Sequence, residues 1–517
     1  MTRKERRARS TLFSEELFAS LGLHELIPTP LAVWRPLVSD GLAFFLERLP
    51  AERLMGIVAE LMQWQDDSDS DTARRLVALL THCPTLHKLG QIVARHPSLN
   101  EDLRRQLQTL ETLPPTTPPA TVLARIRAEL RGDIGNIGSI RNIDAAQIEL
   151  ADAARAEGSG AVVMPFTYRE DGQRRHGVFK VLKPGIEQIL AEELAILVEL
   201  APYLEARSKQ LGLPAVDYRD TLETVQRLMT KEVHLEIEQE NLRAAADFYA
   251  DEPALLVPRL LPWCTPRMTA MERVFGSKVT DAELSPQMRQ KLADTMISAL
   301  LGQPFWSTGE RAVVHADLHA GNLFVTADGR LAVLDWSLTA ALTKAQREAL
   351  VAIALGGILL DADSIRRAIA TLGSIAHDDP ILAETVERAL DRVAFQGHVP
   401  GFDWLLTLID ELALQTATGF WEDFVLLRKS WLSLSGVIGD LIGTHSPDPQ
   451  LIGLALQRFL AEMPARSLAQ AQPGAQHFAS HLSNADLLRL CASPWLISLR
   501  YWERCWRQGW SLLGIAS

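Results

Sequence analysis

Two aspartates and an asparagine between residues 313 and 336 have the types and spacing to bind a metal ion on a phosphate. In this stretch, VVHADLHAGNLFVTADGRLAVLDW, Asn322 follows Asp317 by five residues and Asp335 follows it by eighteen. An Asp-Gly pair between them predicts a turn, so a hairpin would bring the two ends together in space. Carboxylate and amide oxygens are the ligands that Mg²⁺ prefers. The stretch therefore predicts a magnesium site with a further carboxylate beside it.

The same spacing is that of a protein-kinase catalytic loop. HADLHAGN places Asp317 and Asn322 in the D-x-x-x-x-N order of such a loop, and the Leu-Asp-Trp around Asp335 stands where kinases have the metal-binding Asp-Phe-Gly. On this interpretation Asn322 and Asp335 hold Mg²⁺, and Asp317 is the base or orienting carboxylate. The alternative is that these residues only cap turns, as a lone pair would. The joint spacing favours the kinase interpretation.

A kinase also needs a lysine for the ATP phosphates, and FKVLKPG supplies Lys180 within an apolar strand. An unpaired ammonium would be costly there, so Lys180 must have a partner. The segment KEVHLEIEQENLRAAADF at 231–248 offers several acids, and helical spacing puts Glu238 and Asn241 on one face. We predict that one acid of this segment pairs with Lys180.

The elements that position these residues follow from the hydrophobic pattern. Helical periodicity over 14–112 leads to a proline-rich segment, LPPTTPPAT at 113–121, that is predicted to be an extended connector. AVVMPFT (161–167) and GVFKVL (177–182) then predict a two-stranded hairpin that turns at an Asp-Gly pair. Further along, the predicted elements are helices over 186–250, strand-like runs at 254–261 and 267–272, and mostly helices from about 284 onward.

Composition and charge argue against several classes of protein. A chain of 517 residues with 47% hydrophobic residues can bury a large core. Its net charge of -12 argues against a nucleic-acid binder, since only the first ten residues form a dense basic run, which we interpret as a solvated tail. The four cysteines lack metal-ligand spacing, and no secretory signal or spanning apolar run is found. We therefore expect a cytoplasmic protein.

Five motifs in order resemble the AarF/UbiB family of atypical kinases, which also includes mitochondrial proteins that support coenzyme Q synthesis. A lone D-x-x-x-x-N would be a weak signal, whereas this combination is specific. The resemblance runs from about Leu86 to Leu342. The motifs are KLGQ at 88–91, GVFKVLKPG at 177–185, KEVHLEIEQEN at 231–241, VPRLLPWCTPRMTAMERVFG at 257–276 and HADLHAGN at 315–322.

The resemblance implies an α+β, two-lobed protein-kinase-like fold with a helical N-terminal extension and a helical C-terminal tail. We expect the extension at 1–121, the N-lobe at 122–275, the C-lobe at 276–450 and a Trp-rich tail at 451–517.

The resemblance also implies a set of roles for single residues. Lys180 would bind the phosphates of ATP and pair with Glu238. Asp317 and Asn322 would lie in the catalytic loop, and Asp335 would ligate Mg²⁺.

The resemblance implies further roles in the N-terminal extension and in the binding of the adenine ring of ATP. Lys88 and Gln91 would belong to the extension that folds over the active site in this family, and Glu232 would be the acid that meets it. Met271 and Glu272 would form the hinge whose backbone recognises adenine.

The sequence departs from the family pattern at three places. The alanine-rich phosphate loop aligns only with DAAQIELA at 144–151, which has Gln147 and Leu150 where the family has serine and glutamine. His234 replaces the aspartate of the family's E-x-D. Trp336 and the serine after it replace the Phe-Gly that follows the metal-binding aspartate. These differences bear on nucleotide preference and on the contact with the extension.

The C-terminal end carries a second pattern, in PWLISLRYWERCWRQGWSLLGIAS. Trp495, Trp502, Trp506 and Trp510 fall on one helical stripe, with Arg500, Arg504 and Arg507 interleaved. One interpretation is that this tail lies on a membrane surface near isoprenoid lipid, where the arginines would suit anionic headgroups. The other is that the stripe docks on the protein itself.

The resemblance implies ATP binding with Mg²⁺ and slow ATP hydrolysis or phosphoryl transfer, in support of isoprenoid quinone (ubiquinone) or related lipid metabolism. The protein would then lie in the cytoplasm, peripheral on the inner face of the membrane. Two alternatives remain, of which the first shares H-x-D-x-x-x-x-N and the later metal-binding aspartate but would lack the K-x-G-Q of KLGQ. One is a small-molecule hydroxyl phosphotransferase of the choline or aminoglycoside kinase-like type, and the other is a nucleotide-sensing pseudokinase scaffold.

Overall fold

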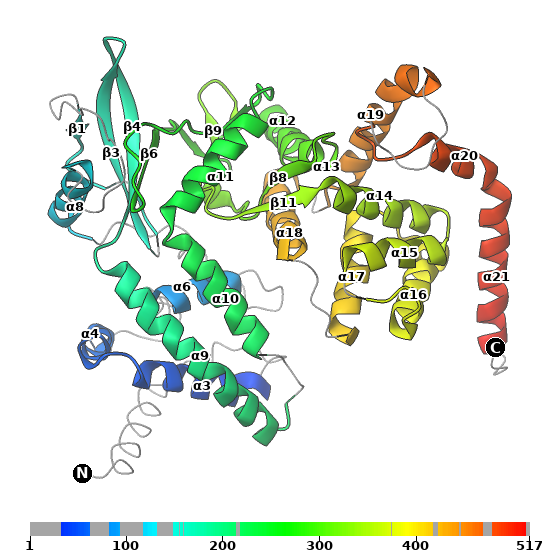
Figure 1. Cartoon of the computed structure of the whole chain (residues 1–517), viewed down its shortest axis with the longest axis horizontal. Helices are drawn as coiled ribbons and strands as arrows, with labels where there is room; N and C mark the ends of the chain where they lie inside the picture. Colours follow the sequence, from blue (N-terminus) through cyan, green and yellow to red (C-terminus); the bar gives the residue numbers. More distant parts are fainter. Residues whose placement is uncertain are drawn as a thin grey trace. The chain divides into compact units, whose positions relative to one another are not determined.

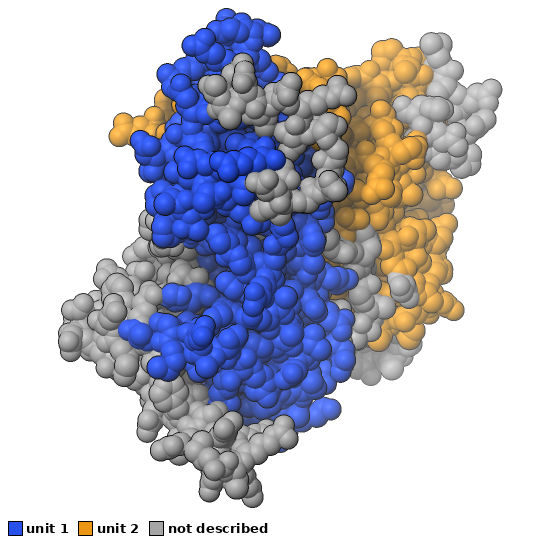
Figure 2. Space-filling model, turned by 60° about the vertical axis from the view of Figure 1, so that its left-hand side comes forward, with its two compact units in different colours: residues 1–240, 259–273 blue, residues 241–258, 274–517 orange. Residues whose placement is uncertain are grey.

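The computed structural model divides into two compact units, each of which combines helices with strands (Figures 1 and 2). The first unit holds residues 1–240 and 259–273, and the second holds 241–258 and 274–517. The predicted α+β fold class is confirmed, while the four-part division of the chain stays a prediction. The residues described are 33–62, 82–93, 117–131, 148–154, 156–158, 160–213, 218–373, 375–416, 422–443, 446–468 and 478–512. The basic run at the N-terminus lies outside them.

One part of the first unit is an antiparallel sheet. Its strand order is β1-β3-β4-β6, with β2 paired to β3 as well. The turn between the two long strands has positive φ at Asp171 and Gly172, 51° and 76°, as a tight two-residue hairpin requires. The hairpin predicted from the sequence is thus present. The strands are β1 (Glu149–Leu150), β2 (Ala156–Glu157), β3 (Ala161–Glu170), β4 (Gln173–Leu182) and β6 (Met268–Glu272).

Side chains along β4 point alternately to the two faces of the sheet, and this alternation sets the direction of Lys180. Phe179 and Val181 are buried in a core that also holds Phe166 of β3, whose ring stacks on Phe179 at 4.0 Å between centroids. Helix α8 (Pro119–Arg131) covers this face with Val122. Because successive side chains of a strand point to opposite faces, Lys180 points away from this core.

The predicted extended connector is partly wrong, because α8 already begins at Pro119. Proline in the first turn of a helix loses no hydrogen bond and has a suitable φ, so the proline-rich stretch starts a helix here instead of preventing one.

A second core in the first unit joins the described helices of the predicted N-terminal region to α9. At its polar edge the buried carboxylate of Glu193 accepts hydrogen bonds from Thr85, N–H at 2.9 Å and Oγ at 2.6 Å, and pairs with Arg53. This contact fixes α6, which carries KLGQ, on α9. The helices are α3 (Arg35–Glu47), α4 (Ala51–Met62), α6 (Pro84–Val93), α9 (Ile186–Gln210), α10 (Tyr218–Glu232) and α11 (Leu235–Phe248), the last of which continues into the second unit.

Two small sheets in the second unit carry the other predicted site residues. One has the order β5-β10-β9-β7, and the other pairs β8 with β11. The strand predicted over 254–261 is mostly wrong, since only Leu255–Leu256 forms a strand there; Pro258 has no N–H to continue the ladder. The strands are β5 (Leu255–Leu256), β7 (Gly276–Lys278), β8 (Arg311–His315), β9 (Leu323–Thr326), β10 (Leu331–Val333) and β11 (Thr339–Thr343).

Helices make up most of the rest of the second unit, as the sequence predicts (Figure 1). Within the described part of the chain, none of them is both long and apolar enough to span a membrane. They are α12 (Pro286–Thr295), the π-helical η4 (Met296–Gly302), α13 (Gln303–Phe305), the 3-10 turn η5 (Ala320–Asn322), α14 (Lys344–Ile358), α15 (Ala362–Leu372), α16 (Pro380–Gln396), α17 (Phe402–Thr416), α18 (Glu422–Ile442), α19 (Asp448–Leu468), α20 (Asn484–Ala492) and α21 (Pro494–Leu512).

Candidate active site

Lys180 and Glu238 form an ion pair inside the first unit. Lys180 Nζ lies 2.8 Å from Glu238 Oε1, and the two side chains are 15% and 2% exposed. The next residue on α11, Gln239, donates its side-chain N–H to the carbonyl of Thr265 at 2.9 Å, which fixes this end of the helix. The pairing expected from the sequence is therefore present, on a strand and a helix that are both anchored.

The neighbouring Lys183 is engaged elsewhere. Its Nζ lies 2.7 Å from Oε1 of Glu157, whose other carboxylate oxygen accepts the backbone N–H of Thr117 at 2.9 Å. Lys183 thus ties the end of β4 to β2 and to the residues that precede α8. Of the two lysines in FKVLKPG, Lys180 is the one paired with an acid of α11.

A hairpin in the second unit brings Asn322 and Asp335 close together. β9 and β10 pair with Leu323 opposite Val333, so Asn322 and Leu334 flank the ends of the two strands. The N–H of Leu334 donates to the carbonyl of Asn322 at 2.9 Å, which places the adjacent Asp335 next to this residue. The hairpin predicted between these two segments is thus present.

Asp317 belongs to the same loop as Asn322. The side-chain N–H of Asn322 donates to the carbonyl of Asp317 at 3.0 Å, and this bond orients the Asn322 amide. Because the amide nitrogen is engaged in this way, the Asn322 oxygen is the atom suited to a cation. The carboxylate of Asp317 is a separate group on the same loop, and it is partly exposed.

His315 holds the loop to the segment that precedes Asp335. Its Nδ1 accepts the N–H of Asp317 at 3.1 Å, and its Nε2 donates to the carbonyl of Leu334 at 3.0 Å. Burial lowers the pKa of His315, so the ring is neutral, and the two bonds require one tautomer. This histidine is the first residue of HADLHAGN, and no role for it was predicted from the motif.

The backbone of Asp335 is strained, and Trp336 supports it. Asp335 has φ of 55°, in the left-handed region that few residues other than glycine adopt, although aspartate tolerates it. Trp336 is buried, donates its indole N–H to the carbonyl of Val333 at 3.1 Å and packs edge-on against His315 at 4.6 Å between centroids. Asn241 of α11 donates to the Trp336 carbonyl at 3.0 Å. The tryptophan that replaces phenylalanine is therefore part of the packing that holds Asp335.

A cation from a distant part of the chain meets the catalytic loop. Lys429 of α18 lies with Nζ 2.9 Å from Asp317 Oδ1. Lys429 was not among the residues predicted from the sequence. A single lysine inside a helix of mixed polarity carries no signal of the loop that it will contact.

The oxygen atoms of Asn322 and Asp335 suit Mg²⁺. In the described part of the chain, no three His, Cys, Asp or Glu residues gather into a metal-binding group. A magnesium ion that arrives on ATP does not need such a group, because it usually takes one or two protein oxygens and completes its shell with phosphates and water. The donors present therefore fit that ion.

Three other predicted residues of the first unit lie on two of its helices. Lys88 and Gln91 are on α6, and Glu232 is the last residue of α10; α6 packs against α9 and α10 (Figure 1). The side chains of Gln91 and Glu232 lie outside the described part, as do residues 144–147 of the phosphate-loop segment DAAQIELA, while Leu150 is in β1.

Met271 and Glu272 end β6, opposite Val178 and Gly177 of β4. The backbone N–H of Glu272 donates to the carbonyl of Arg259 at 2.9 Å, and its carboxylate pairs with the same arginine at 3.1 Å. This backbone donor is thus already used by the segment between β5 and β6. The adenine-binding role of the two residues stays a prediction.

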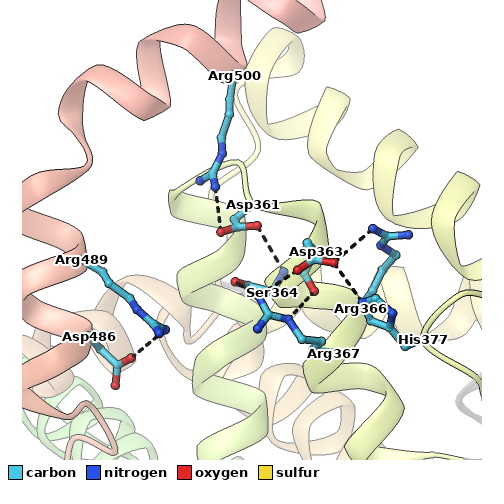
Figure 3. A network of polar contacts seen from close by, with 9 residues as sticks. All are labelled: Asp361, Asp363, Ser364, Arg366, Arg367, His377, Asp486, Arg489 and Arg500. Carbon is cyan, nitrogen blue, oxygen red and sulfur yellow. Dashed lines mark hydrogen bonds and ion pairs between the residues drawn. The ribbon is translucent and has the colours of Figure 1, made fainter. Parts of the chain in front are cut away.

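The C-terminal helix α21 contacts the second unit through its arginines. Arg500 pairs with Asp361 at 2.9 Å, as Figure 3 shows, and the buried Arg504 pairs with Glu387 and Asp391, both at 2.8 Å. Acidic side chains of the protein thus bind these two arginines, and the lipid contact of the tail stays a prediction.

The described tryptophans of the stripe are exposed instead. They are Trp495, Trp502 and Trp506, while the side chain of Trp510 lies outside the described part. The helix thus docks on the protein with its basic face, and the three described tryptophans of its aromatic face are exposed.

Residues 168–369 match the model of the ABC1 atypical kinase-like domain. A "Probable protein kinase UbiB" of Pseudomonas fluorescens is 28% identical over 262 residues, which cover 49% of this chain and 45% of that protein. "Protein ACTIVITY OF BC1 COMPLEX KINASE 1, chloroplastic" of Arabidopsis thaliana is 27% identical over 317 residues, 60% of this chain and 44% of that protein. This chain thus matches less than half the length of either relative.

Among solved structures, the complex of Rv3197 with erythromycin from Mycobacterium tuberculosis is similar with a TM-score of 0.43 and 15% identity, covering 85% of this chain and 95% of that chain.

Proposed function

Because this chain belongs to the AarF/UbiB family of atypical kinases, we propose that it binds ATP with Mg²⁺ and transfers or hydrolyses the terminal phosphoryl group. One observation supports this most strongly. The β9–β10 hairpin sets Asp335 beside Asn322, on the same loop as Asp317. That arrangement combines two metal ligands with a carboxylate that can receive a proton.

In this proposal Lys180 neutralises the phosphates of ATP. Its ammonium is held by the buried Glu238 and has a fixed direction before the nucleotide arrives. A preorganised cation does not have to be reordered during the reaction, and this is the main source of electrostatic catalysis. Glu238 acts through Lys180 and is a positioning residue.

Asp317 orients the attacking hydroxyl group or water and receives its proton. His315 keeps the loop in place through its two hydrogen bonds, and its neutral ring adds no charge to the site. When bound to Asn322 and Asp335, Mg²⁺ would supply the positive charge that stabilises the phosphate oxygens.

The extension and the hinge complete the proposal. Lys88, Gln91 and Glu232 restrict access to the phosphate-binding lysine, and the backbone near Met271 and Glu272 recognises adenine. These roles rest on the motifs KLGQ, KEVHLEIEQEN and TAME.

We place the reaction in isoprenoid quinone or related lipid metabolism, with the protein peripheral on a membrane. The exposed tryptophans of α21 support the membrane contact, since indole rings favour the interface between headgroups and acyl chains. Because Arg500 and Arg504 are bound within the protein, this contact should depend less on anionic lipid than a basic helix would.

A binding experiment tests the nucleotide half of the proposal. Calorimetry of the full chain with Mg-ATP should show saturable binding that K180M weakens by at least about tenfold, because the mutant lacks the ammonium that meets the phosphates. R174M, a change on the same strand at an exposed ion pair with Glu149, should bind as the wild type does. Equal affinity of K180M and wild type would contradict the proposal. Transfer of phosphate to a soluble alcohol would instead favour the small-molecule kinase alternative.

A further inference from the structure

Lys429 and Asp317 form an ion pair between two distant parts of the second unit. Lys429 Nζ lies 2.9 Å from Asp317 Oδ1, and the side chains are 24% and 14% exposed. The catalytic-loop motif HADLHAGN contains neither lysine nor arginine. The loop's own His319 is farther away, with Nε2 4.0 Å from Asp317 Oδ2. Lys429 of α18 thus supplies a permanent positive charge at this carboxylate.

Hydrogen bonds fix α18 beside the strands that lead to the catalytic loop. Asp423, in its first turn, accepts the N–H of Ala341 at 3.1 Å. Ala341 lies on β11, which pairs with β8 so that Thr339 is opposite His315 at the start of the loop. Trp431 is buried two residues after Lys429 and donates to Asp403 of α17 at 2.7 Å. A helix anchored on both sides of Lys429 holds the ammonium at the carboxylate.

The neighbouring Arg428 has a different partner. It pairs with Asp410 of α17, Nε to Oδ2 at 2.9 Å, and both side chains are well exposed. Of these two successive residues of α18, Arg428 contacts the neighbouring helix α17 and Lys429 contacts the catalytic loop. This contrast separates an ordinary surface ion pair from a charge placed at the proposed site.

Negative charge at the site of phosphoryl transfer gives a cation such as Lys429 a role. The terminal phosphoryl group of ATP is anionic, and the carboxylate of Asp317 repels it. A lysine ammonium has three donors in a flexible arrangement, so one group can contact a carboxylate and a phosphate oxygen together. Partial exposure of Lys429 lets an arriving phosphate reach it. Lysine and arginine side chains stabilise transferring phosphoryl groups in just this way.

We propose that Lys429 is a catalytic residue whose ammonium, held on Asp317, contacts the terminal phosphoryl group of Mg-ATP. This inference rests on the proposed function. In the step, the bond from the terminal phosphorus to the bridging oxygen of ADP breaks, and a bond to the acceptor oxygen forms. The acceptor's proton passes to Asp317, and ADP leaves. Lys429 stays protonated throughout and stabilises the transferring oxygens.

Comparison of ATP with ADP tests this contact, because ADP lacks the terminal phosphoryl group. The affinities of the full chain for Mg-ATP and Mg-ADP are measured by calorimetry, and the rate of phosphate release is measured in parallel. We expect K429M to raise the ratio of the ATP to the ADP dissociation constant by about tenfold and to lower kcat by about a hundredfold. K429R, which keeps the charge, should recover part of both losses. R428M removes a positive charge one residue away and should change neither.

The result that would overturn the inference is an unchanged ratio of the two affinities in K429M. If Lys429 had only a structural role, its replacement would weaken the binding of both nucleotides equally and lower the unfolding midpoint. If K429M does not fold, K429Q gives the same comparison, since an amide can still hydrogen-bond to Asp317. Failure of the wild type to bind either nucleotide would refute the proposed function, whereas wild-type binding with an unchanged ratio in the variants would refute only the role of Lys429.

Discussion

Replacing Lys180 by methionine would leave a charged carboxylate buried without its counter-ion. The Glu238 side chain is 2% exposed and the ammonium lies 2.8 Å from it. Removing one partner of a buried ion pair typically costs about 3–5 kcal/mol, because the remaining charge can neither be solvated nor paired. The Lys180 side chain is itself 15% exposed, so water can partly replace it, and we expect the lower end of that range, about 3 kcal/mol.

An exposed ion pair that also involves a residue of β4 provides the control for the buried Lys180–Glu238 pair. Arg174 and Glu149 are 2.7 Å apart, but their side chains are 66% and 70% exposed. R174M should therefore lower the free energy of unfolding by less than about 1 kcal/mol. In the double variant K180M/E238M both charges are absent, and we expect most of the loss in K180M to be recovered.

Hydrogen exchange of the β4 amides, read by mass spectrometry under native conditions, measures the opening free energy of this sheet in all variants. A sheet that opens no more easily in K180M than in R174M, or a double variant less stable than K180M, would contradict a stabilising role of the Lys180–Glu238 pair.

Three further predictions concern the second unit. Asp335→Asn should leave the unfolding midpoint unchanged, since asparagine also tolerates the φ of 55°, whereas Asp335→Val should lose about 1–2 kcal/mol in the same melting experiment. Burial lowers the pKa of His481, whose ring donates to the Phe305 carbonyl, to about 4. The unfolded chain binds the proton first, so urea titrations should show the unit losing about 3 kcal/mol as the pH falls from about 6.5 to about 4, and His481→Asn should flatten that slope. The double variant W502A/W506A should bind vesicles about tenfold more weakly in sedimentation with unchanged circular dichroism; equal binding would exclude the aromatic face as the contact.

The parts of the site that could be predicted from the sequence are those set by local spacing. Asn322 and Asp335 meet because a short hairpin with an Asp-Gly turn separates them, and such a turn is visible in the sequence. Lys180 needed an acidic partner because it lies in an apolar strand, and an acid-rich helix was available to supply one. In both cases the chemistry of the residues themselves restricts the structure.

The parts that could not be predicted depend on packing between distant elements. Lys429 reaches Asp317 only because α18 is bonded to β11, and nothing in the pattern of α18 names that strand. The interleaved arginines of the last helix suggested a lipid contact, yet Arg500 pairs with Asp361, the N-cap residue of α15 (Figure 3). Periodicity shows which residues share a face but not what that face contacts.

Phosphate release from Mg-ATP by the full chain, with Asp335→Asn as the matched variant, tests the central claim most directly. The measurement is made without vesicles and with zwitterionic and anionic vesicles. We predict slow release that rises with vesicles of either kind and falls at least about a hundredfold in D335N, which folds but lacks the metal-binding carboxylate. Mg-ATP binding without release in any condition would contradict the claim of catalysis and favour a nucleotide-sensing scaffold, and release that persists in D335N would contradict the assigned metal site.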